Sequence, residues 1–528
     1  MRRSIYFIGC LLAFINVSPT AMAQLSQAHR FEQEIKSSEE GFTVISLKKE
    51  GLAMIRDINK YDQGKKKWQL EFVDTTLTKI WTSELELSSR LQLVGHEYNA
   101  QHLYLLFREN DKAYYKFHLL TIDFIKQTIE PEDIKFEVEF KLTHFTMSGT
   151  SAIFGGYLNN EPAVLLYNKS SSQPKILPGL FVSEMKLLDV RANQNESFNI
   201  LLSERRGKDK TKLIVRTFDH NGNLLIDDII EIDAKYSVLT GLTGTLEREE
   251  LIVAGTYAEG SAREAIGFFS FVVDPFSEQP VFYNDFGTMD HFLDYMPTRR
   301  AEKIKVKTQK LKSIGQLPNY SSLVMPFRIE ERPDGFYLLA EVYQSSSNSY
   351  NNAYGSSYYS PYMNGYSPYG ISPYSNTNRY YSTPYLNNNP ASYSDVKMME
   401  SVVVKIAMDG QAQKSASIKL DDVRQSDLEQ VGDFVINNDS IFLLYKKDGE
   451  IFYQEEIGDE DEKVEISQSK IKLQGPKDEL KDENSHEGTT RYWYGHHFYV
   501  WGYQTIKDSS READKTRRVF YVNRISVN

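Results

Sequence analysis

The residues of this 528-residue chain that are best suited to chemistry gather near its C-terminal end. Three histidines stand there among large aromatic residues: His486, His496 and His497, with Trp493, Tyr494, Tyr499, Trp501 and Tyr503. Adjacent residues of a strand point to opposite faces, so His496 and His497 are poorly placed to share one metal ion. Packing within a sheet explains the aromatic group without a ligand. The alternative is an aromatic platform for a carbohydrate, formed by Trp493, Tyr494 and Trp501.

Motifs for the common enzymatic chemistries are missing. The chain contains no Gly-x-Ser-x-Gly elbow, no Walker A loop, no Gly-x-Gly-x-x-Gly turn and no His-Glu-x-x-His helix. Residues 219–223 carry oxygen ligands but are more typical of a hairpin turn than of a calcium loop. The sequence therefore predicts no catalytic residue, no metal site and no cofactor. Paired carboxylates for glycoside hydrolysis can come from any two strands, so spacing does not test that chemistry.

The elements that would position these residues are predicted to be strands. Short runs of β-branched and aromatic residues recur along the chain between turn-forming clusters, in units of about 50 residues. Such a period, with about four strands per unit, is typical of a β-propeller blade. We therefore expect an all-β protein in which residues 24–528 form one propeller of about seven blades, within a range of six to eight. Two chain ends that share one blade favour seven, and stacked β-sandwiches are the alternative architecture.

Two insertions interrupt the repeat. The first, 289–320, is rich in arginine and lysine, and residues 298–312 are predicted to form a helix or hairpin arm. A basic run is commonly a solvated face. The functional alternative is a dock for anionic partners such as lipid headgroups, acidic glycans or another protein. Its candidate contact residues are Arg299, Arg300, Lys303 and Lys307.

The second insertion, 345–396, consists mostly of Ser, Asn, Tyr, Gly and Pro. It has almost no aliphatic side chains to bury, so we expect a disordered loop that interrupts a hairpin within one blade. A tolerated surface loop is one interpretation. The other is a sticky aromatic tract whose Ser/Thr-Pro-Tyr motifs contact a partner through Tyr362, Tyr369, Tyr374 and Tyr385.

The N-terminal end predicts export. Arg2 and Arg3 precede an apolar run, and Ala21 and Ala23 occupy the positions that a signal peptidase reads, so residues 1–23 are predicted to be removed before Gln24. A lipoprotein signal ending at Cys10 is the alternative. Cys10 is the one cysteine of the chain, so the mature protein would contain no disulfide and no thiolate.

Net charge and hydropathy limit the kinds of partner that the chain can bind. A net charge of −11 argues against a nucleic-acid partner, because proteins that bind nucleic acid present a basic surface. No later stretch reaches the roughly 18 consecutive apolar residues of a membrane-spanning helix. We therefore expect no transmembrane segment after cleavage of the signal.

Residues 332–341, the tyrosine-rich tract and residues 402–410 together resemble uncharacterised secreted proteins of Bacteroidota, which are β-propeller-like and carry an Asn/Tyr-rich insertion. The resemblance implies a cell-envelope location, in the periplasm or at the outer membrane rather than released from the cell. It implies no catalytic residues.

Three functional hypotheses follow. The first is a non-enzymatic propeller that binds or scaffolds an envelope protein or glycan. The alternative is a carbohydrate-active hydrolase or lyase with carboxylates at the channel mouth. The third is a surface protein that associates with itself through its tyrosines. The sequence assigns neither a ligand nor an oligomeric state.

Overall fold

The computed structural model describes residues 25–528 except 37–40, 100, 110–114, 172, 181–184, 207–209, 248–249, 261, 263, 317, 321, 346–395, 426–427, 438–439, 458–464, 485–487 and 509–514. The predicted signal peptide, with Ala21, Ala23 and Gln24, lies outside the described residues. So do the four candidate tyrosines of the 345–396 tract, Tyr362, Tyr369, Tyr374 and Tyr385. These interpretations stay predictions.

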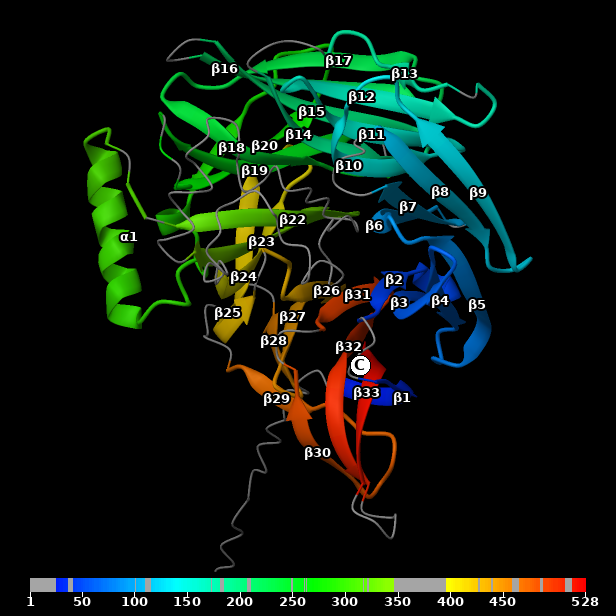
Figure 1. Cartoon of the computed structure of the whole chain (residues 1–528). Coiled ribbons are helices and arrows are strands. Elements are labelled where there is room, and N and C mark those ends of the chain that lie inside the picture. The colour runs from blue at the N-terminus through cyan, green and yellow to red at the C-terminus, as the bar shows by residue number, and fades with distance from the viewer. Residues whose placement is uncertain are drawn as a thin grey trace, which may run out of the picture.

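Within the described residues, the strands form eight antiparallel sheets around a common centre (Figure 1). Blade 1 contains β2 (Thr43–Ser46), β3 (Leu52–Asp62), β4 (Lys65–Val73) and β5 (Lys79–Ser88). Blade 2 contains β6 (Leu91–Tyr98), β7 (Leu103–Glu109), β8 (Lys116–Asp123) and β9 (Thr128–Lys135). Blade 3 contains β10 (Lys141–Ser148), β11 (Ser151–Leu158), β12 (Glu161–Asn168) and β13 (Lys175–Ile176). Blade 4 contains β14 (Met185–Ala192), β15 (Ser197–Arg206), β16 (Lys210–Asp219) and β17 (Leu224–Glu231).

The second half of the ring repeats this pattern. Blade 5 contains β18 (Tyr236–Thr243), β19 (Leu251–Glu259), β20 (Gly267–Val273) and β21 (Phe282–Asp285). Blade 6 contains β22 (Leu323–Arg332), β23 (Gly335–Ser345), β24 (Val396–Ile406) and β25 (Ala412–Gln425). Blade 7 contains β26 (Asp433–Asn437), β27 (Ser440–Lys447), β28 (Glu450–Ile457) and β29 (Ser467–Lys470). Strands β23 and β24 pair directly, so the strands on either side of the tyrosine-rich tract belong to one blade, as the sequence predicts.

Blade 8 joins the two ends of the described chain. It contains β30 (Asp478–Glu483), β31 (Thr490–Tyr494), β32 (His497–Asp508) and β33 (Lys515–Val527), with β1 (Leu25–Glu34) as its outermost strand. The all-β propeller is thus confirmed, and eight blades fall within the predicted range of six to eight. The favoured number was seven because the first unit was assumed to share its blade with the last. Instead, β1 alone completes blade 8, and the first unit is a full blade.

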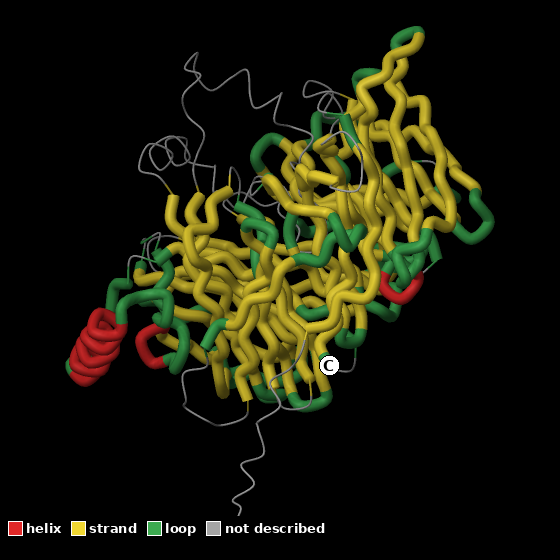
Figure 2. The backbone as a smooth tube through the Cα atoms, turned by 90° about the horizontal axis from the view of Figure 1, so that it is seen from below, coloured by secondary structure: helices red, strands yellow, loops and turns green. Residues whose placement is uncertain are grey.

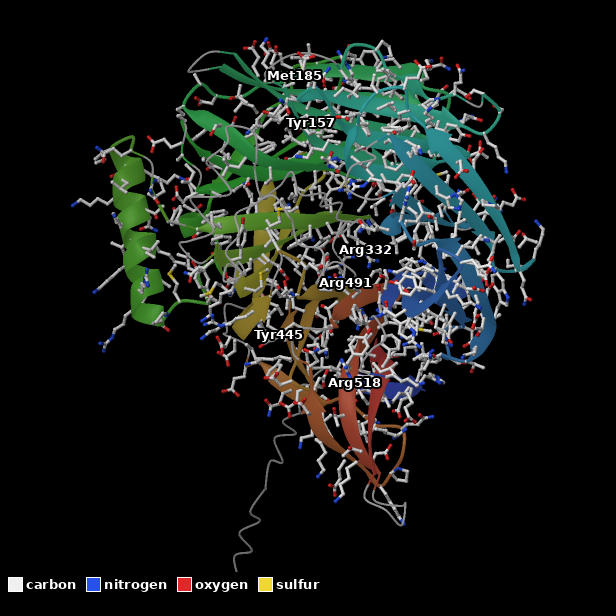
Figure 3. The ribbon with its side chains drawn as sticks, in the orientation of Figure 1. Tyr157, Met185, Arg332, Tyr445, Arg491 and Arg518 are labelled. Carbon is white, nitrogen blue, oxygen red and sulfur yellow. The ribbon has the colours of Figure 1, made fainter. Side chains whose placement is uncertain are left out.

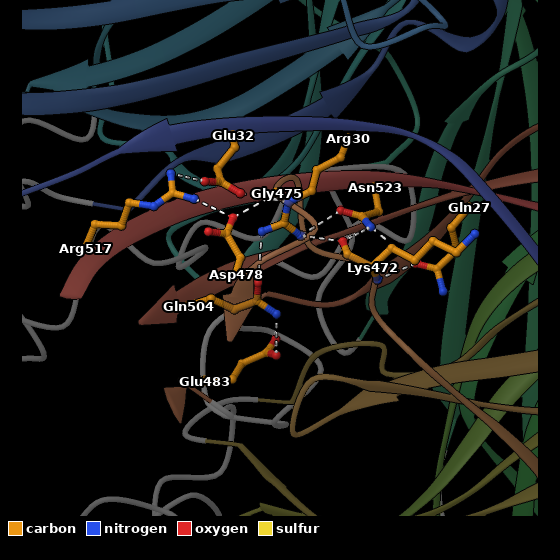
Figure 4. A network of polar contacts seen from close by, with 10 residues as sticks. All are labelled: Gln27, Arg30, Glu32, Lys472, Gly475, Asp478, Glu483, Gln504, Arg517 and Asn523. Carbon is orange, nitrogen blue, oxygen red and sulfur yellow. Dashed lines mark hydrogen bonds and ion pairs between the residues drawn. The ribbon is translucent and has the colours of Figure 1, made fainter. Parts of the chain in front are cut away.

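A buried polar network fastens β1 to this closing blade (Figure 4). The Arg30 guanidinium donates to Glu32 at 2.9 Å, to the Asn523 side chain at 3.0 Å and to the Gln504 side chain at 2.9 Å. It also lies 4.5 Å from the centre of the Tyr521 ring. Burial lowers the pKa of Arg30, although the Glu32 carboxylate opposes that shift. Closure therefore combines a strand ladder with specific side-chain contacts.

A repeated irregularity marks the first strands of blades 2 to 6. In each blade the pairing with the second strand skips one residue, which is a β-bulge: Val94, Thr143, Leu188, Leu239 and Phe327. A bulge increases the local twist and redirects the side chains that follow it. Three residues later, the side chain lines the central channel in four of these blades: Glu97, Thr146, Arg191 and Glu330.

Glycines on the second strands make room for these bulges. A Cβ atom on Gly156 would lie 2.1 Å from the carbonyl oxygen of Lys141, and one on Gly255 would lie 2.1 Å from that of Thr240. Both distances are shorter than any real contact, so only glycine fits. These glycines thus allow the first and second strands of blades 3 and 5 to approach closely.

The blades pack through apolar faces and are linked by polar bonds near the channel. Between blades 6 and 7, for example, Leu339, Val403, Phe434 and Leu443 are fully buried in one cluster. Side chains of one blade also donate to backbone carbonyls of the next: Asn99 to Gly149, Ser148 to Glu196, Asn199 to Gly244 and Trp493 to Gly51. These bonds fix neighbouring blades relative to one another and make the channel lining rigid.

One α-helix lies at the rim. It is α1 (Thr298–Ser313), and it stands outside the body of strands (Figure 2). Two short 3₁₀-helices are η1 (Lys48–Glu50) and η2 (Phe286–Thr288). Within the described part of the chain, no helix has both the length and the apolar character needed to cross a bilayer.

Candidate functional site: the central channel

The centre of the ring encloses a cavity of about 1510 Å³ that is lined by all eight blades. Much of the lining comes from the turns that join the first and second strands, including η1 of blade 1 and Gly495 of blade 8. Arg332 and Arg491 lie near the centre of the ring (Figure 3). The cavity exceeds the roughly 300–1,000 Å³ of a typical small-ligand pocket. Its size suits an extended ligand.

One side of the channel holds an uncommon carboxyl group. Glu97 is partly exposed to the cavity but surrounded by protein, and burial raises its pKa to about 8. The Arg191 charge, a hydrogen bond with Thr146 and the Lys48 charge oppose this shift. These four residues come from four different blades. At neutral pH the Glu97 carboxyl is therefore mostly protonated and can donate a hydrogen bond to a ligand.

The Arg191 guanidinium is held in place by the carboxylate of Asp189. Its Nε and Nη2 atoms contact the two carboxylate oxygens of Asp189 at 3.0 and 3.3 Å. Asp189 also accepts hydrogen bonds from the backbone N–H and the hydroxyl of Thr243, at 2.9 and 3.1 Å. This clasp joins blade 4 to blade 5 and orients the guanidinium.

A second clasp spans blades 6, 7 and 8. Arg328 donates to Glu330 at 2.9 Å and to Asp433 at 2.6 Å, and Arg332 pairs with Glu330 at 2.7 Å. The other carboxylate oxygen of Asp433 accepts the backbone N–H of Tyr492 at 2.7 Å. The charges of Arg328, Glu330, Arg332 and Asp433 are therefore committed to pairs between and within blades.

Two histidines of blades 2 and 3, His96 and His144, are poor proton carriers at neutral pH. Burial lowers the pKa of His96 and of His144 to about 4, so both imidazoles are neutral. Among the residues that the structure describes, no three His, Cys, Asp or Glu side chains are grouped closely enough to hold a metal ion.

The three residues of the predicted aromatic platform all line the cavity, and the rings of Trp493 and Tyr494 lie 5.2 Å apart. Trp493 is only 2% exposed, and its indole N–H donates to the carbonyl of Gly51 at 3.1 Å, so it packs between blades 8 and 1. Tyr494 and Trp501 are half-buried and line the channel. His496 lies in a turn, and His497 contacts the Ser526 hydroxyl at 2.8 Å.

The predicted contact residues of the basic arm lie far from this lining. Arg299, Arg300, Lys303 and Lys307 are all exposed on α1, and no residue of α1 lines the cavity. The structure thus presents two distinct surfaces, the channel and the arm. The sequence patterns did not point to the channel residues Glu97, Arg191, Arg328 and Asp433. Glu97 and Arg191 occupy equivalent positions, three residues after the bulge of their first strands.

The protonated state of Glu97 leads to a prediction on stability. A folded-state pKa above the ordinary value means that the folded chain binds this proton more tightly, so stability falls as the pH rises from about 4.5 towards 8. As the pH is raised from about 5 to about 9, the melting temperature of the Glu97→Gln variant should therefore fall less than that of the wild type. Glu130→Gln, an exposed channel glutamate paired with Lys169, is the control. Equal losses in wild type and Glu97→Gln would contradict the assignment.

Comparison with known proteins finds similar solved structures at low sequence identity. No protein-family model and no curated protein matches this sequence. Similar solved structures include polysaccharide lyase Uly1, at 6% identity over 95% of this chain and 100% of that one, with a TM-score of 0.40. The β-propeller domain of the Trilobed protease from Pyrococcus furiosus shares 9% identity over 82% and 93% of the two chains, with a TM-score of 0.34. TolB from Acinetobacter baumannii shares 12% over 58% and 61%, with a TM-score of 0.26.

These similarities concern the fold alone and transfer no activity. The chain is a β-propeller on the basis of its own eight sheets.

Proposed function

We propose that this protein is exported to the cell envelope and acts there as a non-enzymatic binding propeller that takes an extended glycan into its channel. The main support for this proposal is that charged side chains of the lining are held in place by ion pairs, such as Arg191 with Asp189 and Arg328 with Asp433. Fixed donors and acceptors favour recognition of a ligand in one geometry. The location, in the periplasm or at the outer membrane, rests on the predicted signal peptide and on the resemblance to secreted Bacteroidota proteins.

The choice of a glycan rests on the mixed chemistry of the lining. Half-buried aromatic rings face the cavity beside charged groups: Tyr98, Tyr492, Tyr494 and Trp501. Aromatic faces stack on the apolar faces of sugar rings, while guanidinium and carboxyl groups bond to hydroxyls. A long, polar and partly aromatic channel suits a sugar chain better than a compact apolar molecule.

A carbohydrate-active enzyme is the second candidate, and Glu97 is the observation that favours it. A neutral carboxyl group at pH 7 is what a general acid of glycoside cleavage requires. That reaction also needs a second carboxylate about 5 to 10 Å away. The groups that act most strongly on Glu97 are Arg191, Thr146 and Lys48, and none is a carboxylate. This balance favours binding.

Calorimetry and product analysis on the same oligosaccharides distinguish the two candidates. The mature chain, residues 24–528, is titrated with short neutral and uronic-acid-containing oligosaccharides, and each is then examined by mass spectrometry. We expect binding with recovery of the intact sugar, and we expect Trp501→Ala to weaken binding about tenfold or more through loss of one stacked ring. Phe276→Ala, which removes a 96%-exposed ring outside the channel lining, is the matched control.

Two outcomes contradict the proposal. Cleaved sugar that disappears in Glu97→Gln would replace binding with catalysis. Binding that Trp501→Ala leaves unchanged, or that Phe276→Ala weakens to the same extent, would remove the channel as the site.

A further inference from the structure

The rim helix α1 forms a second surface that the channel does not explain. Seven of its sixteen residues are lysine or arginine, and Glu302 is its one acidic residue. The whole chain carries a net charge of −11, so α1 is a local reversal of charge.

The helix is rigidly mounted. Ala301 and Thr308 are buried against the propeller, and the Thr308 hydroxyl contacts that of Tyr320 at 3.0 Å. Beneath the helix, the rings of Phe286 and Phe292 stack with centroids 3.8 Å apart. Lys312 pairs with Asp285 at 2.5 Å, which fixes the last turn. Because both ends and the inner face are held, the outer face has a defined orientation.

The segment that leads into α1 is anchored as well. The His291 ring contacts Asp294 in the same segment and Glu456 in blade 7, each at 3.1 Å. The His291 carbonyl accepts a hydrogen bond from the Ser417 hydroxyl of blade 6 at 2.8 Å. The arm is therefore part of the folded propeller and not a loosely tethered helix.

The outer face of α1 concentrates its cations. At about 100° per residue, five of the six exposed cations and the exposed Val306 fall within an arc of about 120°. These five are Arg299, Arg300, Lys303, Lys307 and Lys310, whereas Lys312 lies outside the arc and pairs with Asp285. None of the five forms an ion pair with any residue that the structure describes. The spacing of Arg299, Lys303 and Lys307 places like charges four residues apart, which destabilises a helix unless an anionic partner is present.

Two aliphatic side chains accompany these cations. Val306 is 66% exposed between Lys303 and Lys310, and Ile314 is 61% exposed just beyond the helix. Aliphatic groups among lysines suit a surface that offers negative charge at its top and apolar chains just below it. An acidic protein or polysaccharide offers charge without that apolar layer. Lysine, a flexible point charge, also suits a diffuse layer of headgroups better than a single planar partner.

We propose that the outer face of α1 docks this protein on an anionic lipid bilayer. The cations meet the headgroup phosphates, and Val306 and Ile314 enter the boundary with the acyl chains. The inference is independent of the proposed glycan binding, because no residue of α1 lines the channel.

Vesicle co-sedimentation tests the docking. The mature chain is mixed with vesicles of phosphatidylglycerol and phosphatidylethanolamine, or of phosphatidylcholine alone. We expect binding to the anionic vesicles only, weakened by salt, and reduced at least about 100-fold in the triple variant Lys303→Glu, Lys307→Glu, Lys310→Glu. These side chains point to solvent, so circular dichroism and melting temperature should match the wild type.

A second triple variant controls for net charge. Lys126→Glu, Lys169→Glu and Lys235→Glu change three exposed lysines of blades 2, 3 and 5 and should leave vesicle binding unchanged. Equal loss in both triple variants, or no loss in the α1 variant, would overturn the proposal. A third variant, Val306→Ser with Ile314→Ser, should weaken vesicle binding but not binding to soluble polyglutamate. If polyglutamate binds as tightly as vesicles and neither depends on Val306 or Ile314, the partner is an acidic polymer instead.

Discussion

Replacing Glu483 by alanine is expected to lower the free energy of unfolding by about 3–5 kcal/mol, because it leaves a buried lysine without its carboxylate. Glu483 and Lys446 are 2% and 3% exposed, and their charged atoms lie 2.6 Å apart across the contact between blades 8 and 7. The Glu483 carboxylate also accepts the Tyr521 hydroxyl at 2.7 Å and the Gln504 amide at 3.0 Å. Urea unfolding followed by tryptophan fluorescence measures the loss.

The control lies on the same strand. Glu479→Ala removes an exposed carboxylate that pairs with Lys481, and such a pair contributes about 0–1 kcal/mol. Because burying two charges is itself costly, the double variant Lys446→Met, Glu483→Leu should recover part of the loss of Glu483→Ala. A loss below about 1 kcal/mol in Glu483→Ala would show that the pair is hydrated in solution.

The position of this pair explains why its effect should be large. Gln504 bonds both to Glu483 and to Arg30 (Figure 4). Together with the pair of Lys446 and Glu483, these bonds form a network from blade 7 through the inner and middle strands of blade 8 to the N-terminal strand β1. Losing Glu483 therefore weakens the blade that closes the ring. A propeller without closure exposes strand edges on both sides of the gap.

The repeat made the architecture predictable from sequence, and β1 made the exact blade number difficult. Seven blades are continuous in the chain, so their hairpins follow from local patterns of strands and turns. Strand β1 pairs with a strand almost 500 residues away, and no local pattern specifies that pairing. Its sequence, Leu25–Glu34, is mostly polar, and its apolar residues are three positions apart, so it lacks the alternation that indicates a strand.

The channel residues were harder to predict for a related reason. Glu97, Arg191 and Asp433 belong to blades 2, 4 and 7, and only ring closure brings them around one cavity. Each looks like an ordinary polar residue in its own repeat. Trp493 shows the same difficulty, since this residue of the predicted aromatic platform lines the cavity and also donates its indole N–H to Gly51 of blade 1. Residue type alone does not tell a channel wall from an interface between blades.

Glu341 should make stability depend on pH by about 3 kcal/mol, the second largest effect that we expect. Its side chain is fully buried in β23, where it accepts the Ser401 hydroxyl at 2.7 Å and the Gly432 backbone N–H at 2.7 Å. Burial nevertheless raises its pKa to about 7. The folded state therefore holds this proton more tightly than the unfolded state, whose carboxyl titrates near its ordinary value of 4.5. Stability is highest below that value, falls as the pH rises to about 7, and is constant above it.

The variant Glu341→Gln isolates this contribution, because an amide keeps one acceptor oxygen and does not titrate. The stability difference between about pH 5 and about pH 8 should shrink by about 3 kcal/mol relative to the wild type, whereas Glu231→Gln, on the exposed edge strand β17, should leave it unchanged. Glu341→Ala provides a second comparison. It leaves the Ser401 hydroxyl and the Gly432 N–H without this acceptor, so it should destabilise the protein at both pH values. If the Gln variant keeps the full pH dependence, then the hydrogen-bond donors around Glu341, which are Ser401, Gly432 and the Val431 N–H, control its protonation instead of its burial. The contact between blades 6 and 7 would then contain a permanent charge.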